Sequence, residues 1–165
     1  MNIPQDLNYK TQEYMRAEDD ADVVLATLGV HNPPVPTGII QKIFQDVTID
    51  VVAFSDEYLG FSFHEYGAWR ILINSDLPLT AKRFTAFHEL YHMLQGNPGY
   101  CSSTTEGTFE ERKANYFAAC ILMPARWVRK YWDINNDIDS LADIFNVGTT
   151  VVEIRLKNLE HYLAA

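Results

Sequence analysis

Cysteine, basic charge and long apolar runs are all scarce in this chain of 165 residues. Its two cysteines, Cys101 and Cys120, are too few for a disulfide framework and favour free thiols in a reducing compartment. No run of about 18 apolar residues occurs, so no transmembrane helix is expected. Lysine and arginine number 13 against 22 acidic residues, and the formal charge of −9 argues against nucleic acid as the main partner. It suits a basic protein partner instead.

The composition, with 47% hydrophobic and 13% aromatic residues, supports an ordinary globular core. The N-terminus has neither a basic start nor an apolar run, which predicts a cytoplasmic protein without a signal peptide. The length fits one domain with a small appendage. We expect a core over residues 1–132 and a helical appendage over residues 133–165.

The pattern along the chain predicts an α+β fold, in which helices pack on a small antiparallel sheet of three strands. The strands are expected at Val47 to Phe54, Tyr58 to Phe63 and Trp69 to Asn74. Helices are expected at Thr11 to Leu28, Thr37 to Phe44, residues 81–95 and from Thr108 to Pro124, with a loop from Asn97 to Gly107.

The C-terminal segment shows two short helices around a tight turn at Asn146 to Gly148, a pattern that resembles a helix-turn-helix. Residues 137–165 carry five acidic residues against only Arg155 and Lys157. A DNA-reading helix normally presents a basic face to phosphate, so direct DNA binding is the weakest functional hypothesis. The apolar positions of this segment predict that it docks on the core.

Residues Thr85 to Leu94 read T-A-F-H-E-L-Y-H-M-L and carry the clearest chemical signal. His88 and His92 lie one helical turn apart on one face, so their imidazoles can converge on one zinc ion at about 2.0–2.1 Å each. Glu89 lies on a neighbouring face, where it can act as a general base on a water at the metal. The alternative is that these three residues are merely the solvated face of a helix. Apolar residues cover most of the helix and leave one narrow polar stripe, which favours a cleft and hence a metal site.

A catalytic zinc needs a third protein ligand, and the helix starting at Thr108 offers Glu110 and Glu111. Helical phase does not separate the two glutamates. Thr108 and Glu111 also match a capping box, which requires no metal. Cys101 is a conceivable further ligand, although a lone loop cysteine more often has no such role.

R-F-T-A-F-H-E-L-Y-H from Arg83, followed by E-R-K-A-N-Y-F-A-A-C-I-L-M-P from Glu111, resembles the ImmA/IrrE family of zinc metallo-endopeptidases. The resemblance covers about residues 21–160, and it implies a zincin-type active-site helix with Glu111 as the third zinc ligand. Tyr91 departs from a position where glycine is frequent in the family, and Gly148 from one where serine is common.

The resemblance implies a zinc-dependent endopeptidase that cleaves a helix-turn-helix transcriptional repressor, with zinc on His88, His92 and Glu111 and with Glu89 as the base. The competing hypothesis is a non-catalytic, zinc-binding regulator or toxin-like protein that sequesters such a repressor. An intact Glu89 favours catalysis, because a structural zinc requires no base. A second oxyanion donor stays open among Tyr100, Tyr116, His64 and Arg126. We also predict that an extended substrate pairs with Tyr58 to Phe63 as an edge strand.

Overall fold

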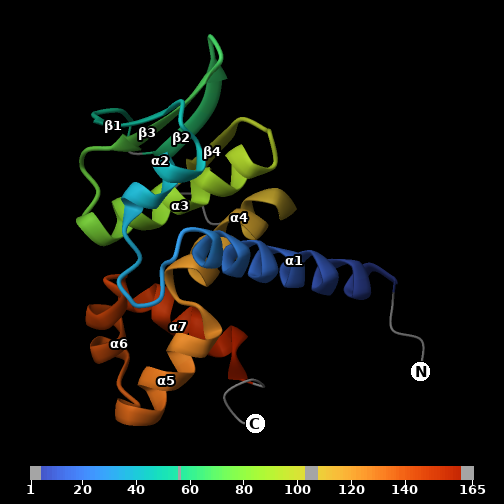
Figure 1. Cartoon of the computed structure of the whole chain (residues 1–165), viewed down its shortest axis with the longest axis vertical. Helices are drawn as coiled ribbons and strands as arrows, with labels where there is room; N and C mark the ends of the chain where they lie inside the picture. Colours follow the sequence, from blue (N-terminus) through green and yellow to red (C-terminus); the bar gives the residue numbers. More distant parts are fainter. Residues whose placement is uncertain (1–4, 56, 103–107, 161–165) are drawn as a thin grey trace.

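The computed structural model describes residues 5–55, 57–102 and 108–160, and for residues 5–11 and 99–102 it describes the backbone only. The elements run α1 (Gln5–Thr27), η1 (Thr37–Ile39), α2 (Ile40–Ile43), β1 (Val47–Val52), β2 (Tyr58–Glu65), β3 (Ala68–Asn74), α3 (Leu79–Leu94), β4 (Gly99–Ser102), α4 (Phe109–Leu122), α5 (Ala125–Asn135), α6 (Ile138–Phe145) and α7 (Thr149–Asn158). Figure 1 shows the sheet at one end, α3 directly beneath it, α4 and α1 next, and α5 to α7 at the other end.

The four strands form one mixed sheet in the order β1-β3-β2-β4. β2 and β3 form a hairpin closed by Tyr66 and Gly67, and β4 pairs antiparallel with the other side of β2. β1 instead pairs parallel with β3, with Val47 opposite Trp69. The predicted α+β class is confirmed, but the predicted antiparallel order of three strands is wrong. An antiparallel sheet of three successive strands pairs consecutive strands, whereas β3 lies between β1 and β2, and β4 lies in a segment predicted to be a loop.

α3 is the central helix of the fold, and it contacts both the sheet and α4. Its residues from Thr85 to Met93 are all buried, which agrees with the prediction of a largely apolar core helix. Around it lies a hydrophobic core to which α1, α4, α6 and α7 contribute the fully buried side chains of Leu25, Phe117, Phe145 and Val152. The helix α5 begins directly after Pro124, and the sequence pattern does not predict it.

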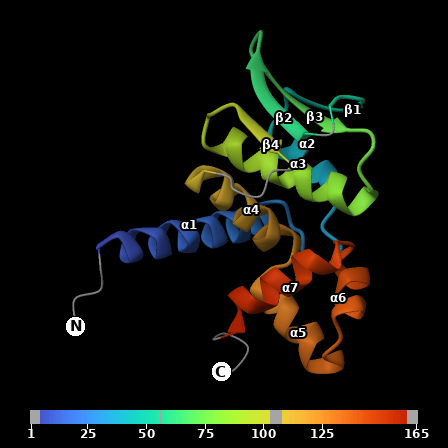
Figure 2. The same ribbon diagram turned by 180° about the vertical axis from the view of Figure 1, so that it is seen from behind.

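The helices α6 and α7 are attached to the rest of the chain by two buried arginines. Arg155 of α7 forms an ion pair with Glu18 of α1 and donates a hydrogen bond to the Met123 carbonyl oxygen at 2.9 Å. Arg83 of α3 donates to the carbonyl oxygens of Asn146 at 3.1 Å and of Val35 at 2.8 Å. The view from behind in Figure 2 shows α7 beneath α4, on the side away from the sheet.

The predicted pair of short helices is present, and Asn146 ends α6 in the left-handed conformation at φ 52°. The helix-turn-helix interpretation and the division of the chain at residue 132 stay predictions. No helix in the described part of the chain is both long and apolar enough to cross a membrane. The cytoplasmic location also stays a prediction.

Candidate metal centre

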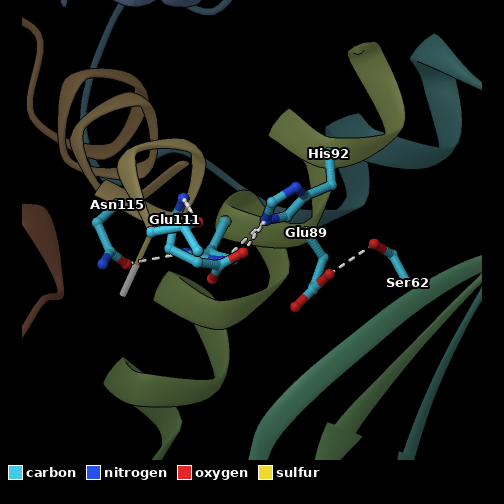
Figure 3. A network of polar contacts seen from close by, with 7 residues as sticks. Ser62, Glu89, His92, Glu111 and Asn115 are labelled. Carbon is cyan, nitrogen blue, oxygen red and sulfur yellow. Dashed lines mark hydrogen bonds and ion pairs between the residues drawn. The ribbon is translucent and has the colours of Figure 1, made fainter. Parts of the chain in front are cut away.

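The centre lies where α3 and α4 pack together, beneath β2. His88 and His92 come from consecutive turns of α3, and the centroids of their rings lie 5.0 Å apart. Glu111 comes from the first turn of α4, and its two carboxylate oxygens face the imidazoles of His88 and His92; Figure 3 shows Glu111 on α4 and His92 on α3 turned toward each other. Residues distant in sequence therefore meet because the two helices are packed side by side.

Three side-chain groups converge on one point. The Nε2 atom of His88 lies 3.0 Å from Glu111 Oε2, and the Nε2 atom of His92 lies 3.1 Å from Glu111 Oε1. The two Nε2 atoms are 3.2 Å apart. Ligands about 2.0–2.1 Å from zinc in a tetrahedron lie about 3.3 Å from one another, so these separations suit such an ion. The donor set of two imidazoles and one carboxylate is also one that catalytic zinc uses.

The structure distinguishes Glu110 from Glu111, the two alternatives for a third metal ligand in the sequence. Glu110 faces Lys113, with 2.8 Å between Oε1 and Nζ, and 60% of its side chain is exposed. Glu111 faces the histidines, while its backbone N–H donates to Thr108 Oγ1 at 3.3 Å. Half of the predicted capping box is thus present, but the Glu111 carboxylate is directed to the imidazoles instead of the helix end. Burial acts to raise the pKa of Glu111, and its contacts with the two histidines outweigh it and lower the pKa to about 2.

Glu89 lies beside the three groups and is fully buried. Ser62 Oγ of β2 donates a hydrogen bond to Glu89 Oε2 at 2.5 Å, whereas Glu89 Oε1 has no hydrogen-bond partner among the described residues. Burial raises the pKa of this carboxyl, although the charges of the neighbouring histidines and the Ser62 hydrogen bond oppose the rise. A buried carboxylate oxygen without a partner next to a possible metal site is an arrangement that fits a general base.

Two residues of this site had not been identified from the sequence. Asn115 lies one turn after Glu111 on α4, and its Oδ1 is 2.8 Å from Nδ1 of His88. A proton on Nδ1 then leaves the Nε2 lone pair free for a metal. The signal for Asn115 was its spacing of four from Glu111. Ser62 had no comparable signal, since only the folded sheet brings β2 over Glu89.

The described candidates for a second oxyanion donor have partners elsewhere. Tyr116 donates a hydrogen bond to Glu18 at 3.1 Å, His64 stacks edge-on against Trp69, and the Arg126 guanidinium lies over the Trp127 ring. The side chains of Tyr100 and Cys101 lie outside the described part of the structure. The predicted substrate strand is wrong as an edge, because β2 pairs with β3 on one side and with β4 on the other.

Comparison with known proteins gives the family of the chain and a solved structure of similar fold. Residues 45–157 match the M78 peptidase family, described as the IrrE N-terminal-like domain. No curated protein matches the chain. Among solved structures, a Mycobacterium tuberculosis transcriptional regulator is similar at a TM-score of 0.64 and 19% identity, which shows a shared fold. The match covers 86% of this chain and 46% of the regulator, so the chain spans less than half of that protein's length. The family match covers most of the chain, and the protein therefore belongs to the IrrE N-terminal-like family of M78 peptidases.

Proposed function

We propose that this protein is a zinc-dependent endopeptidase that cleaves a specific protein partner. The observation that carries the proposal is the position of Glu89, whose Oε1 atom lacks a hydrogen-bond partner beside the group of His88, His92 and Glu111. A purely structural metal site would not require a buried acid at this place. Membership of a metallopeptidase family supports the same conclusion.

His88, His92 and Glu111 would hold the zinc ion through the three atoms that already lie together. When bound, zinc would supply Lewis-acid chemistry, polarising the attacking water and the peptide carbonyl. Asn115 Oδ1 would accept a hydrogen bond from Nδ1–H of His88 and so hold that imidazole in the tautomer and orientation that ligation needs.

Glu89 would perform the proton transfers. Its carboxylate accepts a proton from the attacking water as the water oxygen bonds to the carbonyl carbon. The same carboxyl then gives that proton to the amide nitrogen as the carbon–nitrogen bond breaks, which releases an amine and a carboxylic acid. The burial of Glu89 excludes bulk water from this transfer and makes the free Oε1 atom a stronger proton acceptor.

The proposed partner is a transcriptional repressor. The family resemblance implies such a partner, and the similarity of the fold to that of a transcriptional regulator supports a regulatory setting. The formal charge of −9 suits a basic partner such as a DNA-binding protein. Sequestration of the repressor without cleavage uses the same metal ligands and differs only in making no use of Glu89 as a base.

The test combines metal content with cleavage. The wild type is expected to hold about one zinc per chain, and Glu111→Gln is expected to lose most of it. The exposed neighbour gives a matched control, since Glu110→Gln removes the adjacent carboxylate and should keep zinc. Glu89→Gln should retain zinc and lose cleavage of a repressor substrate by at least about 100-fold. A wild type that binds no zinc after incubation with it would refute the proposal, and wild-type cleavage by Glu89→Gln would remove Glu89 as the base.

A further inference from the structure

We infer that Ser62 is a positioning residue for Glu89, and that it determines which carboxylate oxygen is available as the base. The inference rests on the proposed endopeptidase function and deepens it. Ser62 Oγ lies 2.5 Å from Glu89 Oε2, and the two side chains are only 1% and 0% exposed. Figure 3 shows this contact as the link between the sheet and the site, since Ser62 approaches from β2 and Glu89 from α3.

The two oxygens of Glu89 have different surroundings. Oε2 accepts the short hydrogen bond from Ser62, and Oε1 has no hydrogen-bond partner among the described residues. A carboxylate that turned freely about its last bond would exchange the two oxygens. Anchoring Oε2 therefore holds Oε1 in a constant position, with its lone pairs free to accept a proton.

The backbone of β2 makes Ser62 a rigid anchor. Ser62 lies opposite Ile71 of β3 and opposite Gly99 of β4, so its strand is paired on both sides. Gly60, two residues earlier on the same face, allows the strand to approach α3 closely. A Cβ atom at Gly60 would lie 2.4 Å from Thr85 Cγ2 and 3.6 Å from Glu89 Oε1. The two small residues of β2 thus leave room for a buried carboxylate and for one donor to it.

A purely structural role for Ser62 makes a different prediction. If the hydroxyl only satisfied a buried acid, its removal would lower stability but leave Glu89 oriented as before. A positioning role predicts that the metal stays bound and that the carboxylate changes its orientation. Turnover should then fall while substrate affinity is kept, because a base displaced by about 1 Å can lose on the order of 100-fold in rate.

Thr85 provides the matched control. Its hydroxyl is also buried, and its methyl group lies beside Gly60, but Oγ1 has no hydrogen-bond partner among the described residues. Thr85→Val removes this hydroxyl and keeps the shape of the side chain. Ser62→Ala removes the hydroxyl that contacts Glu89, and Ser62→Cys keeps a similar volume with a weak donor, in case the alanine variant does not fold.

The experiment compares zinc content, kcat and KM, and crystal structures of the zinc-loaded wild type and variants. We expect full zinc in all of them, kcat lowered about 10- to 100-fold with nearly unchanged KM in the Ser62 variants, and wild-type kcat in Thr85→Val. The crystal structures should show Glu89 rotated only in the Ser62 variants. An unchanged Glu89 orientation or an unchanged kcat in Ser62→Ala would overturn the inference, as would loss of zinc. If the wild type cleaves no repressor, the proposed function fails, while the orientation of Glu89 still decides the role of Ser62.

Discussion

Asn115 Oδ1 lies 2.8 Å from His88 Nδ1, and the other nitrogen of the same ring lies 3.0 Å from Glu111 Oε2. One imidazole therefore connects two residues that are one turn apart on α4. Asn115 and Glu111 share a helix face, so the helix that supplies the carboxylate also supplies the group that orients His88. The geometry of the metal centre depends on the packing of α4 against α3 and not on the H-E-x-x-H helix alone.

Replacement of Asn115 by alanine should weaken zinc binding without abolishing it. The three proposed ligands stay in place, but the His88 ring loses the acceptor that selects its tautomer. A loss of about 10- to 100-fold in zinc affinity is expected, as for other residues that form a hydrogen bond to a metal-binding histidine. Competition with a chelator of known affinity measures the change. Asn135, an exposed asparagine at the end of α5, gives the control. Equal zinc affinities for the Asn115→Ala and Asn135→Ala proteins would contradict this role.

Removal of Arg155 should destabilise the whole fold. Its guanidinium is fully buried, pairs with Glu18 and donates to the Met123 carbonyl oxygen, so it joins α7 to α1 and to the end of α4. Arg155→Met leaves the Glu18 carboxylate without its cation, and the expected loss is about 3 kcal/mol in the free energy of unfolding. Arg16→Met, on α1 at a side chain that is 75% exposed, should change it by less than about 0.5 kcal/mol. Denaturant titrations that give equal losses for both variants would refute the account.

The same ion pair predicts a pH dependence of stability. Burial acts to raise the pKa of Glu18, but the hydrogen bond and charge of Arg155 outweigh it and lower the pKa below the ordinary value of 4.5. A lowered pKa in the folded state contributes stability that is present above the unfolded value and is lost as the pH falls through the folded pKa. The difference in unfolding free energy between the wild type and Glu18→Gln should thus shrink as the pH is lowered from about 4.5. Titrations of both proteins in metal-free buffer measure it, and a difference that grows toward acid pH would contradict the prediction.

The close approach of β2 to α3 predicts a coupling between Gly60 and Thr85. A Cβ atom at Gly60 would meet Thr85 Cγ2 at 2.4 Å and the Leu72 carbonyl oxygen at 3.0 Å. Gly60→Ala should lower the free energy of unfolding by about 1–3 kcal/mol through this overlap. Combining it with Thr85→Ala removes the nearer atom, so the double variant should be more stable than the sum of the single effects by about 1 kcal/mol. A double-mutant cycle from denaturant titrations tests this. Strictly additive changes in the free energy of unfolding would show that the two residues do not overlap sterically.

The parts of the fold that local patterns determine were predictable from the sequence. The central helix, its polar stripe and the helix after Thr108 follow from the spacing of apolar residues over about four turns. The choice of Glu111 over Glu110 required the family resemblance, because helical phase alone places both near the apolar face. In the structure the choice is plain, since Lys113 pairs with Glu110 and the histidines face Glu111.

The strand order of the sheet and the contact of Ser62 with Glu89 were missed because both depend on contacts between distant segments. The sequence of a strand predicts that a strand forms but does not determine which neighbour it pairs with. The parallel pairing of β1 with β3 could therefore not be predicted. The strand β4 follows Pro98 in a stretch rich in glycine, serine and threonine, which local rules assign to a loop. In the sequence Ser62 is an ordinary strand residue. It contacts Glu89, which is 27 residues further along the chain, only because β2 packs against α3 in the fold. The geometry of the proposed base therefore depends on the folded sheet and could not be predicted from the sequence.

The turn between β2 and β3 holds a residue that local rules disfavour. Tyr66 has φ +50° and Gly67 has φ +83°, between the paired residues Glu65 and Ala68, a pattern typical of a type I′ turn. Glycine tolerates this conformation, but an L-residue other than asparagine or aspartate loses about 1 kcal/mol in it. Tyr66 is 98% exposed, so the rest of the fold offers its side chain almost no compensating contact. Tyr66→Asn should therefore raise the free energy of unfolding by about 1 kcal/mol, whereas Tyr66→Ala, which also disfavours positive φ, should change it much less. Thermal and denaturant unfolding of the two variants beside the wild type measure the difference. Equal stability of the asparagine and alanine variants would mean that backbone strain at Tyr66 does not limit the stability of this hairpin.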